Sequence, residues 1–226
     1  METRERIIQA ASALFMQQGY SASGLKQISQ ASEAPIGSLY HFFPGGKAEL
    51  AAETLRASGH AYEALVMAVL DSDPDIVRSV LTCFGGAGDH LRATGYADAC
   101  PIATVALEVA STDEPLRLVT AEIFASWLDA ATDRFVRGGI EPGRARQFAT
   151  LFVAALEGGF LLSRASKDAA AMETIGALLA ELFADEPARR SPPPSDSGVD
   201  TEGAESGASQ VSPSSSRATS ASRLRA

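Results

Sequence analysis

The stretch of residues 23–43, SGLKQISQASEAPIGSLYHFF, predicts two short helices joined by a tight turn. Each half has apolar residues at helical spacing. These residues are Leu25, Ile28 and Ala31 in the first half, and Leu39 and Phe43 in the second. The turn falls at residues 32–34, and Pro35 suits the first turn of the second helix because its ring fixes φ near the helical value. Two short helices arranged in this way are typical of a helix-turn-helix unit, whose second helix enters the DNA major groove.

Polar side chains of the second helix could recognise DNA. Gly37 would let the backbone approach DNA closely, while Ser38, Tyr40 and His41 offer hydrogen-bonding groups on the face opposite the apolar residues. Lys47, at the start of the next helix, can contact a phosphate through its charge and through the helix N-terminus. The same spacing also fits a helical hairpin in an all-α core, with the polar side chains merely exposed. Spacing and turn alone leave both interpretations open.

The chain up to residue 186 reads as one helix after another, without sustained period-2 alternation, so the predicted fold class is all-α. Gly19 is expected to end the first helix and Ser23 to cap the second. Ser111 or Thr112 is expected to cap the long helix that Gly138-Gly139 ends. The expected helices cover about residues 4–18, 24–31, 35–42, 47–70, 75–93, 101–110, 113–137, 142–163 and 168–184.

Length, charge and cysteine content narrow the class of protein. The 226 residues are 46% apolar, and the formal net charge is −9. Residues 1–47 have a net charge of +1, whereas residues 48–186 have a net charge of −11. The N-terminal segment therefore lacks the net negative charge that would oppose DNA binding. Two cysteines exclude a disulfide scaffold and favour a reducing compartment. The N-terminus lacks a secretory signal and no uninterrupted apolar run spans a bilayer, so we expect a cytoplasmic protein without a membrane partner.

The last 40 residues, 187–226, differ in composition from the rest of the chain. They contain 11 serines and five prolines, with few apolar residues other than alanine. Such a segment cannot bury enough apolar surface to offset the entropy of ordering it. We therefore expect a disordered tail.

One motif decides between the two interpretations of the helical pair. The sequence Gly37-Ser38-Leu39-Tyr40-His41-Phe42-Phe43-Pro44, followed by Lys47-Ala48-Glu49-Leu50, resembles the N-terminal DNA-binding domain of the TetR family of regulators over about residues 4–55. The extra glycine in Pro44-Gly45-Gly46-Lys47 is similar to the LmrA/YxaF-type branch. The segment Cys100-Pro101-Ile102-Ala103-Thr104-Val105-Ala106-Leu107-Glu108 resembles the C-terminal domain of that branch.

The resemblance implies a dimeric, ligand-responsive transcription regulator, usually a repressor that a small apolar effector releases from its operator. Residues 1–55 would form the helix-turn-helix DNA-binding domain and residues 56–186 the helical effector-binding and dimerisation domain. The implied partners are double-stranded operator DNA, a second copy of the chain and a small-molecule effector of unknown identity. The residues at DNA-contacting positions are Ser23, Lys26, Gln27, Pro35, Ile36, Gly37, Ser38, Tyr40, His41 and Lys47.

Two residues depart from the family pattern. Ile36 stands where Lys or Arg is usual, so one phosphate or guanine contact is missing, although an apolar side chain could meet a thymine methyl. Glu33 stands at the turn position usually held by Gly, which brings a negative charge near DNA and backbone strain. Both departures favour the alternative that the chain is a helical ligand-binding or interaction protein with weak or lost DNA binding. Salt-dependent binding to its own promoter region would separate the two.

Candidates for ligand binding come from the later helices. Aromatic residues on helical faces could line an apolar cavity between helices, although core packing explains each one alone. The candidate ligand-binding residues are Phe84, Cys100, Thr104, Leu107, Phe124, Trp127 and Phe160. Residues 85–88, Gly-Gly-Ala-Gly, lack the ending of a phosphate loop. They predict either a break in a helix or a pliable pocket wall.

No sequence pattern predicts catalysis, a cofactor or a metal site. A Ser-His-Asp order, a nucleophile elbow and a convincing carboxylate pair are missing from the sequence, so we expect a protein that is not an enzyme. A group of possible ligands lies close in sequence, but no pair has the spacing of a preformed metal site. This group comprises Cys83, Asp89, His90, Asp98 and Cys100.

The last two expected helices, 142–163 and 168–184, carry more apolar residues than one buried face needs. One face could be covered by Phe148, Leu151, Phe152, Ala155, Leu156 and Gly159, and a second by Phe160, Leu178, Leu179 and Leu182. Gly158-Gly159 would let helices approach closely. In the family that the chain resembles, these two helices form the four-helix bundle of the dimer. The alternative is that they only close the core of one chain and leave a polar outer face.

Overall fold

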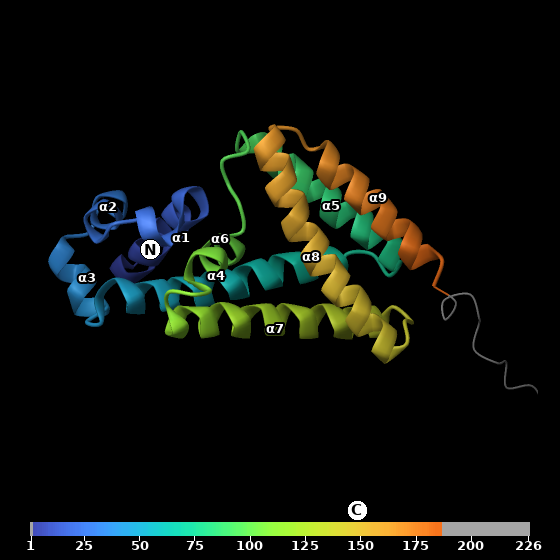
Figure 1. Ribbon diagram of the computed structural model, residues 1–226, viewed down its shortest axis with the longest axis horizontal. Helices are drawn as coiled ribbons and strands as arrows, with labels where there is room; N and C mark the ends of the chain where they lie inside the picture. The colour runs from blue at the N-terminus through green and yellow to red at the C-terminus, as the bar shows by residue number, and fades with distance from the viewer. Residues whose placement is uncertain (1, 187–226) are drawn as a thin grey trace, which may run out of the picture. The chain divides into compact units, whose positions relative to one another are not determined.

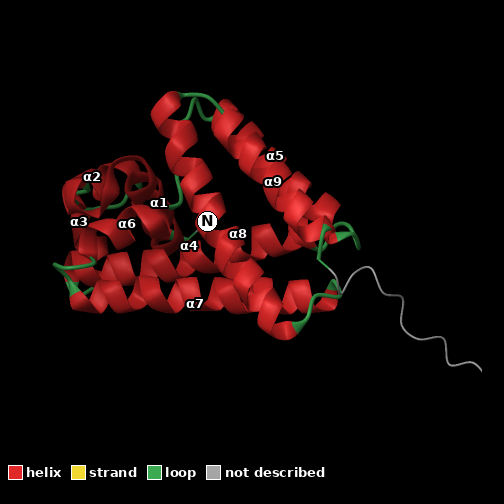
Figure 2. Ribbon diagram, turned by 45° about the vertical axis from the view of Figure 1, so that its right-hand side comes forward, coloured by secondary structure: helices red, strands yellow, loops and turns green. Residues whose placement is uncertain are grey.

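The computed structural model describes residues 2–186, and every regular element within that range is an α-helix (Figure 2). The predicted all-α fold class is confirmed. The predicted tail, 187–226, lies outside the described residues. The helices are α1 (Thr3–Ala22), α2 (Leu25–Ala31), α3 (Ile36–Phe42), α4 (Gly46–Leu70), α5 (Ile76–Ala93), α6 (Pro101–Val109), α7 (Glu114–Arg137), α8 (Pro142–Ser166) and α9 (Ala170–Ala184).

The first hydrophobic core holds α1, α2 and α3 against the N-terminal half of α4. Its buried side chains include Phe15, Ile28, Leu39 and Phe43. Helix α6 and the first half of α7 belong to the same core, and Figure 1 shows α6 beside α1. The packing therefore does not divide at residue 55, because an element far along the chain joins the N-terminal helices.

The second core lies between the C-terminal half of α4, the end of α7, and helices α5, α8 and α9. Its centre is aromatic, with the rings of Phe135 and Phe183 4.8 Å apart and those of Phe148 and Phe183 4.4 Å apart. Helices α5 and α9 run side by side in both views (Figures 1 and 2). They approach closely at Gly176, where an added Cβ would lie 2.6 Å from the Cβ of Phe84. Since α4 contributes to both cores, it connects the N-terminal helices to the rest.

Helix α5 passes through the glycine-rich stretch without a break. Residues 85–88 all lie within Ile76–Ala93, so the break that the glycines suggested is not present. The side chain of Asp75 caps the helix by accepting a hydrogen bond from the Val77 N–H at 3.0 Å. Packing against α9 and α8 stabilises the helix enough to accept several glycines, each of which costs roughly 0.5–1 kcal/mol relative to alanine.

The cap of α7 differs from the prediction. Asp113, rather than Ser111 or Thr112, caps the helix, and its side chain accepts from the Leu116 N–H at 3.1 Å. The Thr112 hydroxyl instead donates to the carbonyl oxygen of Glu108, at the end of α6. The Thr112 side chain therefore stabilises the C-terminal end of α6, the preceding helix.

The apolar residues of α8 divide between the protein interior and the surface. Phe148, Phe152, Leu156 and Phe160 are buried in the second core. An added Cβ on Gly159 would lie 2.8 Å from the Sδ of Met172, so Gly159 allows α8 to pack on α9 of the same chain. Packing within one chain therefore accounts for most of the residues assigned to the two faces, and the dimer interface stays a prediction.

The outer surface of α8 and α9 is nevertheless apolar rather than polar. Its exposed large side chains are Leu151 and Leu162 on α8, and Leu178 and Leu182 on α9. Each of these leucines is at least 43% exposed. The two helices thus close the core of the chain and still present an unpaired apolar surface.

By length and composition alone, α8 could also cross a membrane. Its 25 residues include a stretch with mean hydropathy 1.4, of which 39% is buried inside the protein. A core helix of a soluble protein passes the same test, so this finding is weak evidence for a membrane-spanning segment.

Candidate DNA-binding surface and effector cavity

The turn between α2 and α3 is held by hydrogen bonds across its base. The Ala34 N–H donates to the Ser29 carbonyl at 3.1 Å, and the Ser29 hydroxyl donates back to the Ala34 carbonyl at 2.6 Å. Between them, Glu33 has φ of +52°, in the left-handed region. The predicted strain at Glu33 is thus present, and its carboxylate lies on the surface of the turn.

Helix α3 has one buried apolar face and one exposed face. Leu39 and the following Phe43 are buried in the first core, whereas Ile36 is 45% exposed and Tyr40 is 54% exposed. Open space surrounds Gly37, and no atom lies within 4 Å of an added Cβ there. The predicted contacts Pro35 and His41 are also exposed, and Ser38 is partly buried. The predicted residues of α3 thus share one accessible face.

The predicted contacts on α2 are exposed at one edge of this face. Lys26 and Gln27 are both accessible, and the side chain of Gln27 pairs with Gln18 of α1, with 2.9 Å between the Gln18 Nε2 and the Gln27 Oε1. This pair aligns the start of α2 with the end of α1.

The sequence predicts that Ser23 caps α2 and contacts DNA, but the structure uses its side chain in another way. Its side chain is fully buried, and its hydroxyl donates to the Gly19 carbonyl at 2.6 Å. Gly24 is the N-terminal boundary of α2, and no side chain caps that helix. The hydroxyl is used by α1 because Gly19, with φ of +84°, kinks α1 and turns its last residues toward Ser23.

Lys47 lies at the start of α4 and contacts the kinked end of α1. Its Nζ lies 4.3 Å from the centre of the Tyr20 ring and 3.4 Å from the Ser21 carbonyl oxygen. Partial burial lowers the pKa of the Lys47 ammonium, and the negative charge of Glu108 acts in the opposite direction. The ammonium therefore lies against the end of α1, beside the helices that carry the candidate DNA contacts.

Glu108 of α6 binds the backbone of α1 directly beyond the kink. Its Oε1 accepts from the Tyr20 N–H at 3.0 Å and its Oε2 accepts from the Ser21 N–H at 2.7 Å. The carboxylate fills the space beside Gly19, where any Cβ would overlap Oε1. Helix α6 is thereby connected to the helices that carry the candidate DNA contacts.

The other side of α6 lines a cavity of about 480 Å³ between α6, α7 and α8. This size suits a small-molecule ligand. Five of the seven predicted ligand-binding residues come together here: Cys100, Thr104, Leu107, Phe124 and Phe160. The structure therefore gathers most of the predicted set on one cavity wall.

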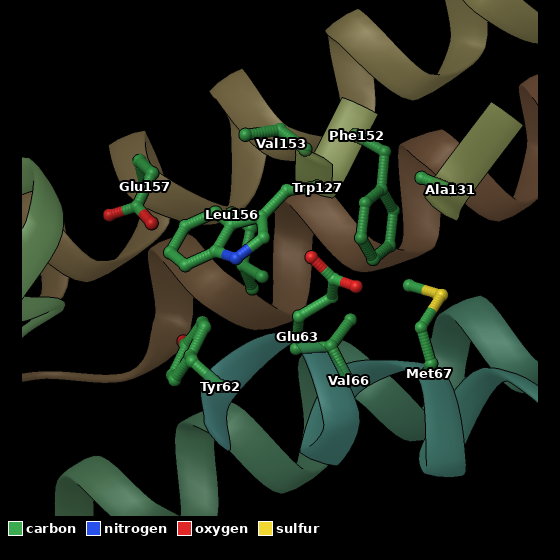
Figure 3. Close-up of a pocket in the computed structure, with 10 residues that line it drawn as sticks. All are labelled: Tyr62, Glu63, Val66, Met67, Trp127, Ala131, Phe152, Val153, Leu156 and Glu157. Carbon is green, nitrogen blue, oxygen red and sulfur yellow. The ribbon is translucent and has the colours of Figure 1, made fainter. Parts of the chain in front are cut away.

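Two predicted ligand-binding residues lie elsewhere. Phe84 is buried in the second core, where it meets Phe152 edge-to-face at 5.6 Å. Trp127 donates its Nε1–H to the Gly59 carbonyl at 3.0 Å and lines a separate cavity of about 20 Å³ (Figure 3). That cavity is large enough for one water molecule but not for an effector.

A further cavity, of about 460 Å³, lies between α4, α5 and α8. It shares Phe160 with the α6 cavity, and its wall includes Cys83, His90 and Asp98. Within residues 2–186, no group of three or more His, Cys, Asp or Glu side chains could hold a metal ion.

Sequence reasoning missed two charged residues on the α6 cavity, Glu157 and Arg164. The Arg164 guanidinium donates to the carbonyls of Tyr96 and Ala97, at 3.3 and 3.0 Å. Glu157 is the single charged residue between Arg146 and Arg164 in the sequence. An isolated charge in an apolar helix is a signal that could have identified it.

Comparison with known proteins identifies the family. A family model described as bacterial regulatory proteins, tetR family, matches residues 7–54, and one described as transcriptional regulator LmrA/YxaF-like, C-terminal domain, matches residues 77–178. The transcriptional regulator YxaF of Bacillus subtilis is 38% identical over 167 residues, which cover 74% of this chain and 87% of YxaF. The chain belongs to the TetR family of transcriptional regulators.

Further relatives agree with this TetR-family assignment. The regulator LmrA of Bacillus subtilis is 30% identical over 182 residues, or 80% of this chain and 97% of LmrA. A TetR-family regulator of Agrobacterium tumefaciens has a TM-score of 0.70 and 25% identity, covering 80% of this chain and 96% of that one. A TetR regulator of Legionella pneumophila has a TM-score of 0.71 at 19% identity, covering 80% and 97%, and supports the fold.

Family membership settles the class of function. The resemblance predicted from the Gly37–Pro44 motif is confirmed, including the LmrA/YxaF-like branch. The chain is therefore a DNA-binding transcriptional regulator with a helix-turn-helix. TetR-family proteins are not enzymes, as the sequence analysis predicted.

Proposed function

We propose that this TetR-family regulator is a repressor that binds double-stranded operator DNA with α3 in the major groove. The observation that carries the proposal is the exposed face of α3, where Ile36, Gly37 and Tyr40 are accessible while Leu39 anchors the helix from behind. Lys26 and Lys47 would contact phosphates on either side of this face. The remaining proposed DNA contacts are Gln27, Pro35, Ser38 and His41.

We propose a functional division of the chain at residue 55, although one hydrophobic core joins α6 and α7 to the N-terminal helices. Residues 1–55 would bind DNA, and residues 56–186 would bind an effector and a second copy of the chain. The exposed leucines of α8 and α9 support a homodimer, because burying them against the same surface of a partner would remove them from water. A two-fold axis through these helices would set the two α3 helices about one turn of DNA apart, roughly 34–36 Å or slightly more.

Effector release would act through α6. The helix lines the 480 Å³ cavity with Thr104 and Leu107 and holds α1 through Glu108. A ligand that binds one conformer of α6 better would shift the population of DNA-binding conformers. The protein would work in the cytoplasm, where DNA is accessible to it.

Transcription from the chain's own promoter region tests the repressor role, because such regulators often control adjacent genes. We expect purified protein to lower transcript yield in vitro and deletion of its gene to raise expression of the adjacent genes. A rise in transcript yield on adding protein would make it an activator instead.

A second candidate, a helical ligand-binding protein that has lost DNA binding, is favoured by two surface residues. Ile36 removes a cation from α3, and Glu33 adds an anion at the exposed turn. An unchanged transcript yield, together with weak binding that does not depend on DNA sequence, would support this alternative.

A further inference from the structure

The α6 cavity has an apolar wall with one acidic group set into it. Glu157 of α8 lines the cavity together with the rings of Phe124 and Phe160 and the aliphatic side chains of Leu107 and Leu161. Figure 3 shows Glu157 among the residues that line the small cavity of about 20 Å³, together with Tyr62 and Trp127, so Glu157 borders both cavities. A ligand that fills the cavity would therefore meet mostly apolar atoms and two charged side chains on the wall, Glu157 and Arg164.

No cation neutralises Glu157. Its carboxylate forms no ion pair with any residue in the described part of the chain, and its hydrogen-bond partner is the buried thiol of Cys100. The other charged residue on the cavity wall, Arg164, already donates to two backbone carbonyls. The thiol is a weak donor and leaves most of the acceptor capacity of the carboxylate unused.

Burial controls the protonation of this group. The surrounding apolar atoms raise the pKa of Glu157 to about 7, so the charged form is costly but accessible at neutral pH. A buried charge is costly unless it is paired. A ligand that brings the missing positive charge would therefore gain more from Glu157 than a neutral ligand of the same shape.

We propose that the α6 cavity binds a small organic cation, with an ammonium group against the Glu157 carboxylate and a hydrophobic body against the apolar wall. The rings of Phe124 and Phe160 would add cation–π attraction beside the carboxylate. The proposal rests on the proposed function in one respect, since it names the chemical class of the effector.

A matched pair of probes tests the charge requirement. 2-Phenylethylamine and 2-phenylethanol have similar bodies and differ in the charge of the polar group. Isothermal titration calorimetry of the full chain at pH 7.5 would measure both affinities. We expect the amine to bind at least about tenfold more tightly than the alcohol, a difference of about 1.4 kcal/mol. Equal affinities, or no binding of the amine at millimolar concentration, would overturn the proposal.

Substitution of the carboxylate locates the cation. Glu157→Gln keeps the shape of the protonated side chain and should weaken amine binding about tenfold while changing alcohol binding less than about twofold. Glu122→Gln is the matched control, because Glu122 lies on the cavity-lining helix α7 but its exposed carboxylate faces Arg56 at 3.8 Å. A loss of amine binding in the control variant, or an equal loss of both probes in Glu157→Gln, would place the cation elsewhere.

Proton release gives a readout that needs no variant. A cation that stabilises ionised Glu157 expels the proton from molecules in which it is protonated, so binding should release about half a proton at pH 7 and much less at pH 8. Titrations in two buffers with different ionisation enthalpies measure this number. Binding without proton release at pH 7 would contradict the proposal.

Operator binding, measured on the same preparation, distinguishes a failure of the proposed cation site from a failure of the proposed repressor function. If the amine fails while sequence-specific DNA binding persists, the effector class is wrong and the regulator function stands. If the amine binds as expected while DNA binding is absent, the repressor proposal is wrong and the cation site stands.

Discussion

The carboxylate of Glu108 on α6 accepts a 3.0 Å hydrogen bond from the backbone N–H of Tyr20 on α1, across 88 residues of sequence. Its second oxygen accepts from Ser21. The pair of bonds satisfies N–H groups that the kink at Gly19 leaves without helical partners. One side chain of the cavity-lining helix therefore fixes the position of the helix that supports the DNA-binding unit.

Removing this carboxylate should loosen the connection between α6 and α1. We expect Glu108→Ala to lower the free energy of unfolding by about 2 kcal/mol, because hydrogen bonds to a charged group contribute about 1.5–3 kcal/mol and these are partly exposed. Operator binding should weaken as well. Glu108→Gln keeps one acceptor and should fall between Ala and the native residue in both thermal unfolding and DNA titration. A Glu108→Ala protein with native stability and native operator affinity would show that the contact has no role.

Glu33, in the turn between α2 and α3, is expected to lower both the stability of the protein and its affinity for operator DNA. Its φ of +52° costs about 1 kcal/mol relative to glycine, and its charge lies near the proposed DNA phosphates. We expect Glu33→Gly to raise both stability and operator affinity. Glu33→Gln removes the charge but keeps the strained backbone, so it should raise only the affinity. If Glu33→Gln leaves the affinity unchanged at low salt, Glu33 does not lie near DNA.

The ammonium of Lys47 is predicted to contact a phosphate. Lys47→Ala should weaken binding about evenly across DNA sequences and reduce the slope of log K against log salt by about 1. Because Lys47 also packs on the Tyr20 ring, thermal unfolding must be measured alongside. Lys167→Gln, at the C-terminal end of α8, is the control for net charge and should leave the slope unchanged. A changed stability with an unchanged slope would assign Lys47 a purely structural role.

The exposed leucines of α8 and α9 test the dimer. We expect Leu151→Glu combined with Leu178→Glu to give a folded monomer that binds operator weakly, because a charge placed in an apolar interface is costly to desolvate. Gly159→Glu should instead destabilise the single chain, since its side chain would collide with Met172. Sedimentation analysis at micromolar concentration distinguishes these outcomes. A double variant that remains dimeric would place the interface on another surface.

The raised pKa of Glu157 predicts a pH-dependent stability. Between pH 4.5 and about 7 the unfolded chain has lost the Glu157 proton while the folded chain retains it, so stability falls as pH rises through this window and levels off above it. Glu157→Gln removes this dependence. The variant should therefore exceed the native protein in unfolding free energy by up to about 3 kcal/mol at pH 8, and by little at pH 4.5. Denaturant unfolding at both pH values measures the difference, and an equal difference at the two would mean that Glu157 titrates normally.

Local sequence signals were sufficient to predict features that depend on a single helix or turn. The turn before Pro35 and the end of α7 at Gly138 follow from the backbone preferences of glycine and proline. Gly19 is expected to end α1, but the helix kinks there and continues to Ala22. The inward position of Leu39 follows from helical periodicity alone.

Tertiary packing decided what the sequence left open. The Ser23 hydroxyl suits either helix, and the kink in α1 assigns it to Gly19. Nothing local to residues 101–109 indicates that α6 packs on α1, because that choice depends on contacts between distant segments. For the same reason, Phe84 and Phe124 look alike in sequence, although one lies in the core and the other lines the cavity.

A fluorescence-anisotropy titration would compare a duplex from the chain's own promoter region with a scrambled duplex at several salt concentrations. We expect two protomers to bind each promoter site at least about 10³-fold more tightly than the scrambled duplex, with affinity falling steeply as salt rises. Equal affinity for both duplexes at every salt concentration would contradict the claim that α3 reads an operator sequence.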